Sequence, residues 1–542
     1  MNFHDTKRTD RTRGSAAARG ALLVPILGWA VGACSAISPA SDSARPAPGR
    51  VVGTVFHDQD GDGSRGADEP GLAGVAVSNG RDVTRTDADG RYDLALDGDD
   101  AVVFVIKPRD WMTPTNALGL PRFHYLHRPN GSSSMRYGGI APTGPLPDSV
   151  DFALTKRPEP DAFEALLFGD TQTRDAKEVG FLGHDVLPEV IGTDALFGVT
   201  LGDVVFDDLT VYSHVTAAVS KVGVPWYNVH GNHDMDYDAG DDADADDSFE
   251  RVFGPTTYAF DVGRVHFVVL DDVFFFRDAV RNEHGYRGGV TSRDLEFLAN
   301  DLALVPDDRL VVLMMHIPLW EVENRAELFA LLRQRSHVFA VAAHTHALEQ
   351  RWFGVEDGFA PERPLHHYVA GAACGNWWQG SLDEQAIPHT TMRDGAPNGY
   401  TRIRFDGNRY TFEYKAARRP ADHQMTIHVG DHLTSGALDG EVVTINVFAG
   451  SERSVVEWRV NGGEWSGLER VTAEDPFILE LKAEEKAHPH GGRKLNPTRY
   501  PTNHLWRAPV PAGLAAGWHL IEARTKDLFG HEYHAARVVR VE

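Results

Sequence analysis

Apolar residues recur along the chain in three patterns that divide it into three regions. Residues 51–157 hold short β-type runs between Gly, Asp and Pro, among them VVGTVF, RYDLAL and AVVFVIK. Residues 158–418 alternate apolar runs such as LLFGD and LVVLMMH with helix-like stretches at 293–304 and 325–335. Residues 419–542 return to strand-like runs, among them EVVTINVFA, VVEWRVN, FILEL and GWHLIEARTKD. Short runs with frequent turns indicate β-sheet, whereas apolar strands alternating with helices indicate an α/β domain.

We therefore predict a multidomain protein. A central α/β domain at 158–418 lies in sequence between two small all-β domains, a β-sandwich at 51–157 and a β-rich domain at 419–542. The 542 residues suffice for several domains. With 42% hydrophobic and 24% charged residues, the composition is that of a folded globular protein.

The first 50 residues differ from the rest of the chain. Basic residues precede the apolar stretch 21–33, which is too short to span a bilayer, so we predict a signal peptide at 1–33. Val31-Gly32-Ala33-Cys34 resembles a bacterial lipobox, in which Cys34 is lipidated, and residues 34–50 have a linker composition. We expect a bacterial envelope protein, periplasmic or an outer-membrane lipoprotein, that is held at the membrane if Cys34 is lipidated. Plain secretion, or an ordinary apolar N-terminal segment, is the alternative.

Charge and cysteine content exclude two further classes. Lys and Arg number 53 against 78 Asp and Glu, which gives a net charge of −25. Such a surface repels phosphate backbones, so we expect no nucleic acid polymer as a partner. The two cysteines, Cys34 and Cys374, cannot form a disulfide framework, and we expect Cys374 to be an inert buried thiol. Nothing in the sequence indicates an oligomeric state.

In the central domain, successive apolar runs end at residues able to bind metals. Ligands gather at the carboxyl ends of strands in α/β sheets, so we expect these side chains to converge. Nitrogen and oxygen ligands without thiolates suit Mn²⁺, Fe²⁺, Zn²⁺ or Mg²⁺. Seven candidates are too many for one tetrahedral ion, so we predict two divalent ions sharing one carboxylate. The candidates are Asp170, Gln172, Asp203, Asn232, His316, His344 and His346.

The motif order D-x-Q, GD, GNHD, H and HxH resembles that of the calcineurin-like metallophosphoesterases. Stretches such as FGPTTYAFDVGRVHFVVLDD (253–272) and GNWWQG (375–380) extend the likeness to the three-domain type of bacterial envelopes. The resemblance implies a central sandwich of two mixed β-sheets flanked by helices. It also implies an enzyme that hydrolyses a phosphate mono- or diester with a metal-activated hydroxide.

The resemblance assigns roles residue by residue. It implies a shared ligand, Asp203, between the two ions, and a catalytic His233 that faces the phosphate as general acid or charge stabiliser. The ligands implied for the first ion are Asp170, Gln172, Asp203 and His346, and those for the second are Asp203, Asn232, His316 and His344.

Three positions near these motifs refine the expectation. Gln172 stands where many members have His, and its harder amide oxygen favours Mn²⁺. Phe206 stands where purple acid phosphatases have the Fe³⁺-binding Tyr, so we expect no coloured Fe³⁺–tyrosinate site. Asp207 and Asp208 are both candidates to orient His233.

Three further segments carry candidate sites. Trp377 and Trp378 form either a substrate platform or ordinary packing. The acidic loop that follows GNHD, residues 236–247, is predicted to be a solvated mobile loop, with a lid that repels anionic substrates or a further cation site as alternatives. Asp58, Asp60, Asp62 and Glu69 have the spacing of a calcium loop, and an acidic β-turn without an ion is the alternative.

We expect an enzyme that acts on a small phosphorylated substrate. The alternatives are a catalytically silent ligand-binding member of the family and a surface-binding β protein. The complete set of ligands argues against both. Substrate selectivity resides in loops, and the sequence leaves monoesters, diesters and pyrophosphates open.

Overall fold

The computed structural model describes residues 49–96, 98, 100–278, 283–359, 363–388 and 391–542. The predicted signal peptide at 1–33, Cys34 and all but the last two residues of the predicted linker at 34–50 lie outside these ranges. Among the described residues, no helix has both the length and the apolar character needed to cross a membrane.

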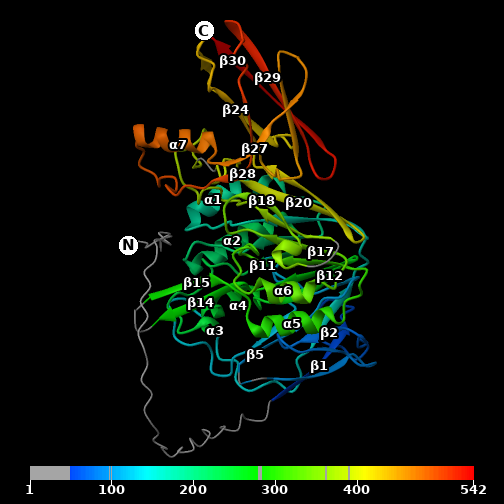
Figure 1. The fold of residues 1–542 in the computed structure, drawn as a ribbon. Helices are drawn as coiled ribbons and strands as arrows, with labels where there is room; N and C mark the ends of the chain where they lie inside the picture. The colour runs from blue at the N-terminus through cyan, green and yellow to red at the C-terminus, as the bar shows by residue number, and fades with distance from the viewer. Residues whose placement is uncertain (1–48, 97, 99, 279–282, 360–362, 389–390) are drawn as a thin grey trace, which may run out of the picture. The chain divides into compact units, whose positions relative to one another are not determined.

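Two mixed β-sheets form the central domain (Figure 1). In the first sheet, β9, β10 and β11 pair in parallel, and in the second, β13, β16, β17 and β19 do so. Antiparallel strands occupy the remaining positions. The first sheet has the order β11 (Trp226–Val229), β10 (Phe197–Leu201), β9 (Ala162–Phe168), β20 (Gly399–Asp406), β21 (Arg409–Ala416). The second has the order β12 (Tyr258–Val262), β13 (Val265–Val269), β16 (Leu310–Met314), β17 (Val338–Ala342), β19 (Leu365–Ala370), β18 (Leu348–Phe353).

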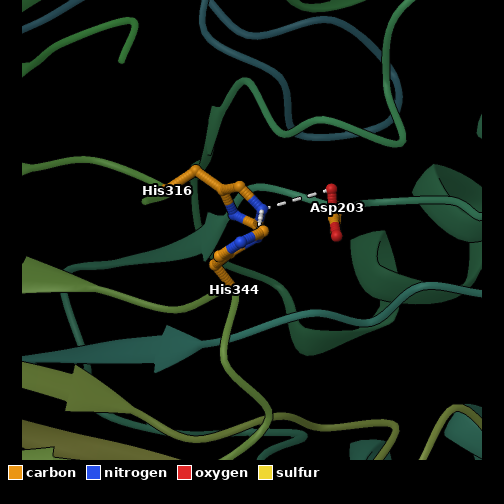
Figure 2. A group of neighbouring side chains, drawn as sticks. All are labelled: Asp203, His316 and His344. Atoms are coloured by element: carbon orange, nitrogen blue, oxygen red, sulfur yellow. Dashed lines mark hydrogen bonds and ion pairs between the residues drawn. The ribbon is translucent and has the colours of Figure 1, made fainter. Parts of the chain in front are cut away.

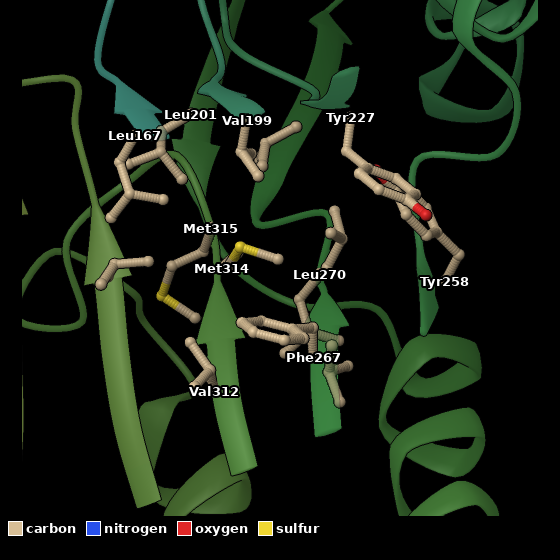
Figure 3. Packing of buried hydrophobic residues seen from close by; sticks show 14 of the residues in the cluster. Leu167, Val199, Leu201, Tyr227, Tyr258, Phe267, Leu270, Val312, Met314 and Met315 are labelled. Carbon is tan, nitrogen blue, oxygen red and sulfur yellow. The ribbon is translucent and has the colours of Figure 1, made fainter. Parts of the chain in front are cut away.

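The two sheets bury their inner faces against each other. Figure 3 shows Leu167 and Val199 of the first sheet in the same apolar cluster as Phe267, Val312 and Met314 of the second. Strands buried on both faces read as continuous apolar runs, which is why the sequence indicated them. The mixed sheets, with helices around them, confirm the predicted α/β class.

Helices connect the strands of the central domain. The predicted helical stretches at 293–304 and 325–335 are confirmed as α5 and α6. Asp175 and Thr291 cap the N-termini of α1 and α5 by accepting backbone N–H groups. The helices are α1 (Ala176–Asp185), α2 (Tyr212–Val219), α3 (Asp242–Ala245), α4 (Asp247–Phe253), α5 (Ser292–Leu302) and α6 (Arg325–Leu332), with single 3₁₀ turns at Leu187–Glu189, Leu209–Val211, Ser220–Val222 and Val355–Asp357. A hairpin of β14 (Val273–Asp278) and β15 (Glu283–Gly288) projects from the central domain in Figure 1.

The flanking domains are built from β-sheets. The N-terminal one has two four-stranded sheets, and its apolar core is continuous with that of the central domain. The C-terminal one has a four- and a five-stranded sheet around a core of its own. The N-terminal strands are β1 (Arg50–His57), β2 (Ala76–Ser78), β3 (Val83–Arg85), β4 (Arg91–Ala95), β5 (Ala101–Val105), β6 (Trp111–Met112), β7 (His124–His127) and β8 (Phe152–Lys156). The C-terminal strands are β22 (Met425–His428), β23 (His432–Leu433), β24 (Val442–Val447), β25 (Val455–Val460), β26 (Ser466–Gly467), β27 (Glu469–Ala473), β28 (Thr502–Pro509), β29 (Gly517–Lys526) and β30 (Glu532–Val541).

One predicted strand is wrong. FILEL (477–481) lies in the helix α7 (Pro476–Ala487) of the C-terminal domain. Asp475 accepts the backbone N–H groups of Phe477 and Ile478 as the N-cap, and Pro476 occupies the first helical position. The following KAEEKA contains strong helix formers, so helix initiation and propensity outweigh the apolar run.

An ion triad that joins β12, β13 and α5 is expected to make the stability of the fold depend on pH. His266 Nδ1 lies 2.8 Å from Asp261 Oδ1, and His266 Nε2 lies 2.7 Å from Asp301 Oδ2. Burial alone would lower the pKa of His266, but the two carboxylates outweigh it and raise the pKa to about 10. The folded state therefore binds a proton that the unfolded chain releases near its ordinary pKa of about 6.5.

We predict that His266→Gln destabilises the protein by about 3–5 kcal/mol near pH 6, since it leaves a buried carboxylate unpaired. The contribution of His266 to the free energy of unfolding is complete below its pKa in the unfolded chain. It is lost as the pH rises towards the pKa of about 10 in the folded protein. Urea unfolding at several pH values tests this, with Arg264→Gln, in an exposed ion pair with Asp308, as the control. A wild-type-to-variant difference as large near pH 10 as near pH 6 would contradict it.

Candidate metal centre

The predicted ligands follow the carboxyl ends of the parallel strands. Asp170 comes two residues after β9, Asp203 two after β10, His316 two after β16 and His344 two after β17. Five of the seven predicted ligands have left-handed backbone conformations that non-glycine residues rarely adopt. These are Asp170 (φ 30°), Gln172 (37°), Asp203 (49°), His344 (67°) and His346 (52°). Each costs on the order of 1–3 kcal/mol, and such strain concentrates at functional sites.

Two glycines of the motifs allow the strand ends to approach each other. A Cβ on Gly202 would lie 2.3 Å from His316 Nδ1, and one on Gly231 would lie 2.1 Å from the Asp203 backbone nitrogen. Neither distance is compatible with a side chain. The glycines of GD and GNHD are therefore required for the close packing of these loops.

Asp203, His316 and His344 form one half of the centre (Figure 2). His316 Nε2 lies 3.3 Å from Asp203 Oδ1 and 3.2 Å from His344 Nδ1. The Asn232 Oδ1 lies 3.1 Å from the same Nε2 atom. His316 Nδ1 donates to the Leu201 carbonyl at 2.8 Å, which leaves Nε2 to face the site. The four residues that the resemblance assigned to one ion are thus brought together.

Asp170, Gln172 and His346 form the other half. His346 Nε2 lies 3.6 Å from Asp170 Oδ1, and its Nδ1 donates to the Gly375 carbonyl at 2.6 Å. Asp170 Oδ1 is buried and has no hydrogen-bond partner. Gln172 Nε2 donates to Asp203 Oδ2 at 2.9 Å, so its oxygen would reach an ion only after the amide turns over. Asp203 faces both halves, one with each carboxylate oxygen.

The protonation of His344 and His346 suits divalent ions. Burial, aided by the neighbouring His316, lowers the pKa of His344 to about 3, and burial lowers that of His346 to about 3. Both imidazoles are therefore neutral near pH 7, as metal ligation requires. Burial would raise the pKa of Asp203, but His316 and His233 outweigh it and lower the pKa. Burial would lower the pKa of His316, but Asp203 and Asp170 outweigh it and raise the pKa to about 10, so an ion would have to displace a proton from this imidazole. The imidazoles, the carboxylates and the unpartnered Asp170 oxygen are a donor set that fits two divalent ions.

His233 lies beside this ligand set. Its backbone N–H donates to Asp203 Oδ1 at 2.9 Å, and its Nδ1 lies 2.6 Å from Asp207 Oδ1. Of the two candidates to orient His233, the structure selects Asp207. The Phe206 ring stacks on the imidazole with centroids 4.3 Å apart, and Arg174 lies 3.9 Å from the Phe206 centroid. The ring position is therefore fixed, and Nε2 remains for a substrate.

Two buried carboxylates to which the sequence assigned no role shape the centre, Asp234 of the GNHD motif and Asp272. Asp234 accepts the backbone N–H groups of Val204 and Gly231, and so ties the GNHD turn to the residue after Asp203. Asp272 Oδ1 accepts the N–H of His316 at 3.1 Å. Both aspartates follow apolar runs, so the same strand-end signal would have identified them.

The two tryptophans have different environments. Trp378 is 2% exposed, and its Nε1 donates to the Thr171 carbonyl at 3.0 Å, so it packs in the interior. Trp377 is partly exposed and stacks on His346 with centroids 4.1 Å apart. Only Trp377 of this pair is placed to contact a substrate. Cys374 is a buried free thiol among the described residues, and burial raises its pKa, which fits an inert role.

The acidic loop at 236–247 is not solvated throughout, which corrects that expectation. Asp236 is fully buried, and its carboxylate accepts the Tyr137 backbone N–H at 2.8 Å. Asp247 is 2% exposed and pairs with Arg128 at 3.0 Å. Short helices α3 and α4 cover part of the segment. The loop contacts residues distant in sequence, which local composition does not reveal.

The predicted calcium loop follows β1, a strand, as expected. Asp58, Asp60 and Glu69 come within 4.8 Å of one another, whereas Asp62 is not in that group. Asp58 and Glu69 also accept backbone N–H groups of the loop, from Gly61 and Gly66 among others.

We predict that Asp60→Ala lowers the unfolding temperature only when calcium is present, since Asp60 is exposed and would act only through the ion. Thermal unfolding with calcium and with chelator measures this. Asp68→Ala, beside the group, is the control. Identical unfolding temperatures of the wild type in both buffers would remove the ion from this loop.

Comparisons with known proteins give two family matches. Residues 59–137 match the N terminal of Calcineurin-like phosphoesterase, and residues 367–533 match the C terminal of Calcineurin-like phosphoesterase. The chain is also similar to a solved purple acid phosphatase, PPD1, from yellow lupin (Lupinus luteus) seeds, with 13% identity and a TM-score of 0.35 over 64% of this chain and 67% of that chain. No curated protein matches the chain. The two family matches flank residues 138–366, which contain the seven predicted ligands.

Proposed function

We propose that this chain is a metal-dependent phosphoesterase that hydrolyses a phosphate mono- or diester at a two-ion centre bridged by Asp203. The matches of residues 59–137 and 367–533 to the N- and C-terminal parts of calcineurin-like phosphoesterases support this proposal. The observation that carries this proposal is the position of Asp203. Its Oδ1 lies 3.3 Å from His316 and its Oδ2 lies 2.9 Å from Gln172, so one carboxylate faces both ligand groups.

The ligands would be divided as the resemblance implies. Asp170, Gln172 and His346 would hold one ion with Asp203, and Asn232, His316 and His344 would hold the other. When bound, the ions would supply a nucleophile from water and stabilise charge on the phosphate. Gln172 favours Mn²⁺, with Fe²⁺, Zn²⁺ and Mg²⁺ as alternatives.

The remaining chemistry belongs to His233. Asp207 on Nδ1 and the stacked Phe206 hold the ring, so Nε2 would face the substrate. Burial lowers the pKa of His233, but Asp203 and Asp207 outweigh it, and the net effect is a raised pKa. A protonated His233 would donate to the departing oxygen or stabilise its charge. Trp377, partly exposed beside His346, would contact the leaving group.

Hydrolysis assays test this function. We expect the full chain to release the chromophore from a nitrophenyl phosphate monoester or diester with Mn²⁺, and a chelator to abolish the release. A panel of sugar phosphates, nucleotides, glycerophosphodiesters and phospholipid head groups would then identify the substrate class. A wild-type protein that retains two ions and turns over nothing in the panel would favour the silent, ligand-binding alternative.

We also propose an envelope location, which the basic and apolar N-terminal segment and Cys34 support. Expression with a clickable fatty acid should label the wild type, and Cys34→Ser should remove the label and release the protein from membranes. Membrane fractions that retain the unlabelled variant would contradict a lipid anchor.

A further inference from the structure

A second group of metal-binding side chains lies outside the centre described above. His230, Asp246 and Asp271 each offer one ligand atom, and these atoms lie within 4.8 Å of one another. They come from three segments: the end of β11, the junction of α3 and α4 in the acidic loop, and the segment after β13. None of the three is assigned to the two-ion centre.

His230 is completely buried, and its Nε2 and the Asp246 oxygen that faces it both lack a hydrogen-bond partner. Its Nε2 lies 3.4 Å from Asp246 Oδ1, and both atoms are buried without a hydrogen-bond partner. An N–H···O hydrogen bond usually spans about 2.7–3.2 Å. Two ligands at about 2.0–2.1 Å from a tetrahedral Zn²⁺ are about 3.4 Å apart. The spacing fits two ligands of one ion. The Nδ1 contact with Asp271 is equally long, so the distinguishing observation is that Nε2 and the Asp246 oxygen are both left without a hydrogen bond.

The other ring nitrogen has the partner that a metal-binding histidine usually has. His230 Nδ1 lies 3.4 Å from Asp271 Oδ1, and Asp271 also accepts the Val273 backbone N–H. Such a carboxylate fixes the tautomer and directs Nε2 towards an ion. The side chain of Asp246 is 16% exposed although its Oδ1 is buried, so the pair lies just below the protein surface.

The surroundings are strongly negative. Asp242, in the same loop, accepts the Phe275 backbone N–H, and burial together with the nearby Asp271 raises its pKa to about 7. Burial and Asp271 likewise raise the pKa of Asp246 against the opposing effect of His230. Burial would lower the pKa of His230, but Asp246 and Asp271 outweigh it and raise the pKa to about 10. A cation bound here would therefore replace the imidazole proton in offsetting the negative charge.

We propose that His230 and Asp246 bind a third divalent cation, with Asp271 orienting the imidazole. The imidazole–carboxylate pair suits Zn²⁺ better than Ca²⁺. The ion fastens the acidic loop to the residues immediately before Asn232 and His233. It is a structural ion, separate from the chemistry of the two-ion centre.

Metal stoichiometry tests the proposal. The full chain is stripped with chelator, reloaded with Zn²⁺, passed through a desalting column and measured by mass spectrometry. We expect Asp246→Asn to bind one ion fewer than the wild type, and Asp238→Asn, an exposed carboxylate of the same loop, to bind as many as the wild type. Asp271→Asn should keep the ion with an affinity lower by about 10–100-fold.

The outcome is independent of the two-ion centre. An Asp203→Ala chain should still hold one ion that Asp246→Asn removes, even if the assignments around Asp203 fail. Because Asp246 is partly exposed, its variant should fold, and circular dichroism checks this. A folded Asp246→Asn chain with wild-type stoichiometry would overturn the proposal and identify the group as a plain ion triad.

Discussion

An Asp203→Ala chain is expected to lose both ions of the two-ion centre and to lower kcat/KM by about 10³-fold or more. The expectation follows from geometry. Asp203 is 1% exposed, and its two oxygens face the His316 side and the Gln172 side respectively. Each half would lose its shared ligand, and the remaining ligands in each half are mostly neutral amides and imidazoles.

A more conservative variant, Asp203→Asn, removes the negative charge of the side chain and keeps its shape. Asp203→Asn keeps the volume and one oxygen, so it should retain the fold and the hydrogen bond from the His233 backbone N–H, yet bind both ions weakly. Asp194→Asn, an exposed aspartate in the loop before β10, is the matched control and should behave as the wild type. Metal content and phosphatase rate are measured on the same preparation. One ion retained at full occupancy in Asp203→Ala would exclude the bridging role.

The sequence predicts the central domain because buried parallel strands require a particular pattern, an apolar run that ends in polar residues. A strand buried on both faces must be apolar throughout, and its first polar residues must therefore mark its carboxyl end. Asp170 and Asp203 follow neighbouring strands of one sheet, and His316 follows a strand of the other. Their convergence therefore follows from these strand-end positions together with the packing of the two sheets. Their distribution around two ions did not follow from topology, and the family resemblance supplied it.

What the sequence did not reveal depends on contacts between distant segments. Trp378 looks like its neighbour in the sequence, yet only the fold buries it against the Thr171 carbonyl. Asp236 and Asp247 look like solvated loop residues, yet Tyr137 and Arg128 of the N-terminal domain pair with them. Residues 476–487 form the helix α7 instead of the predicted strand because the Asp475 cap and the proline that follows it outweigh the short apolar run.

The proposed two-ion centre lies where several residues have strained backbone conformations, which the surrounding sheets must stabilise. Asp170 and Asp203 both have positive φ, and both lie in buried segments directly after their strands. Gln172 donates its backbone N–H to the Asp203 carbonyl at 2.8 Å, which locks the first two strand ends together. A ligand set that is fixed before binding loses little conformational freedom when an ion arrives. The rigid sheets therefore favour tight, specific ligation at this edge.

Replacement of His233 is expected to separate catalysis from metal binding. His233→Asn should keep both ions and lower kcat by about 10²–10⁴-fold, because the side chain lies beside the ligands without being one of them. Asp207→Asn should cause a smaller loss, because it removes the partner of Nδ1 at 2.6 Å and leaves the imidazole in place. Asp208→Asn, the neighbouring carboxylate that does not contact His233 in the described hydrogen bonds, is the control.

A substrate with a better leaving group sharpens this test. If His233 donates a proton to the departing oxygen, the loss in His233→Asn should be smaller for a nitrophenyl ester than for an alkyl ester, since nitrophenolate leaves without protonation. If it stabilises charge on the phosphate instead, both esters should lose activity to the same extent. Loss of an ion from His233→Asn would contradict both roles and make His233 a ligand.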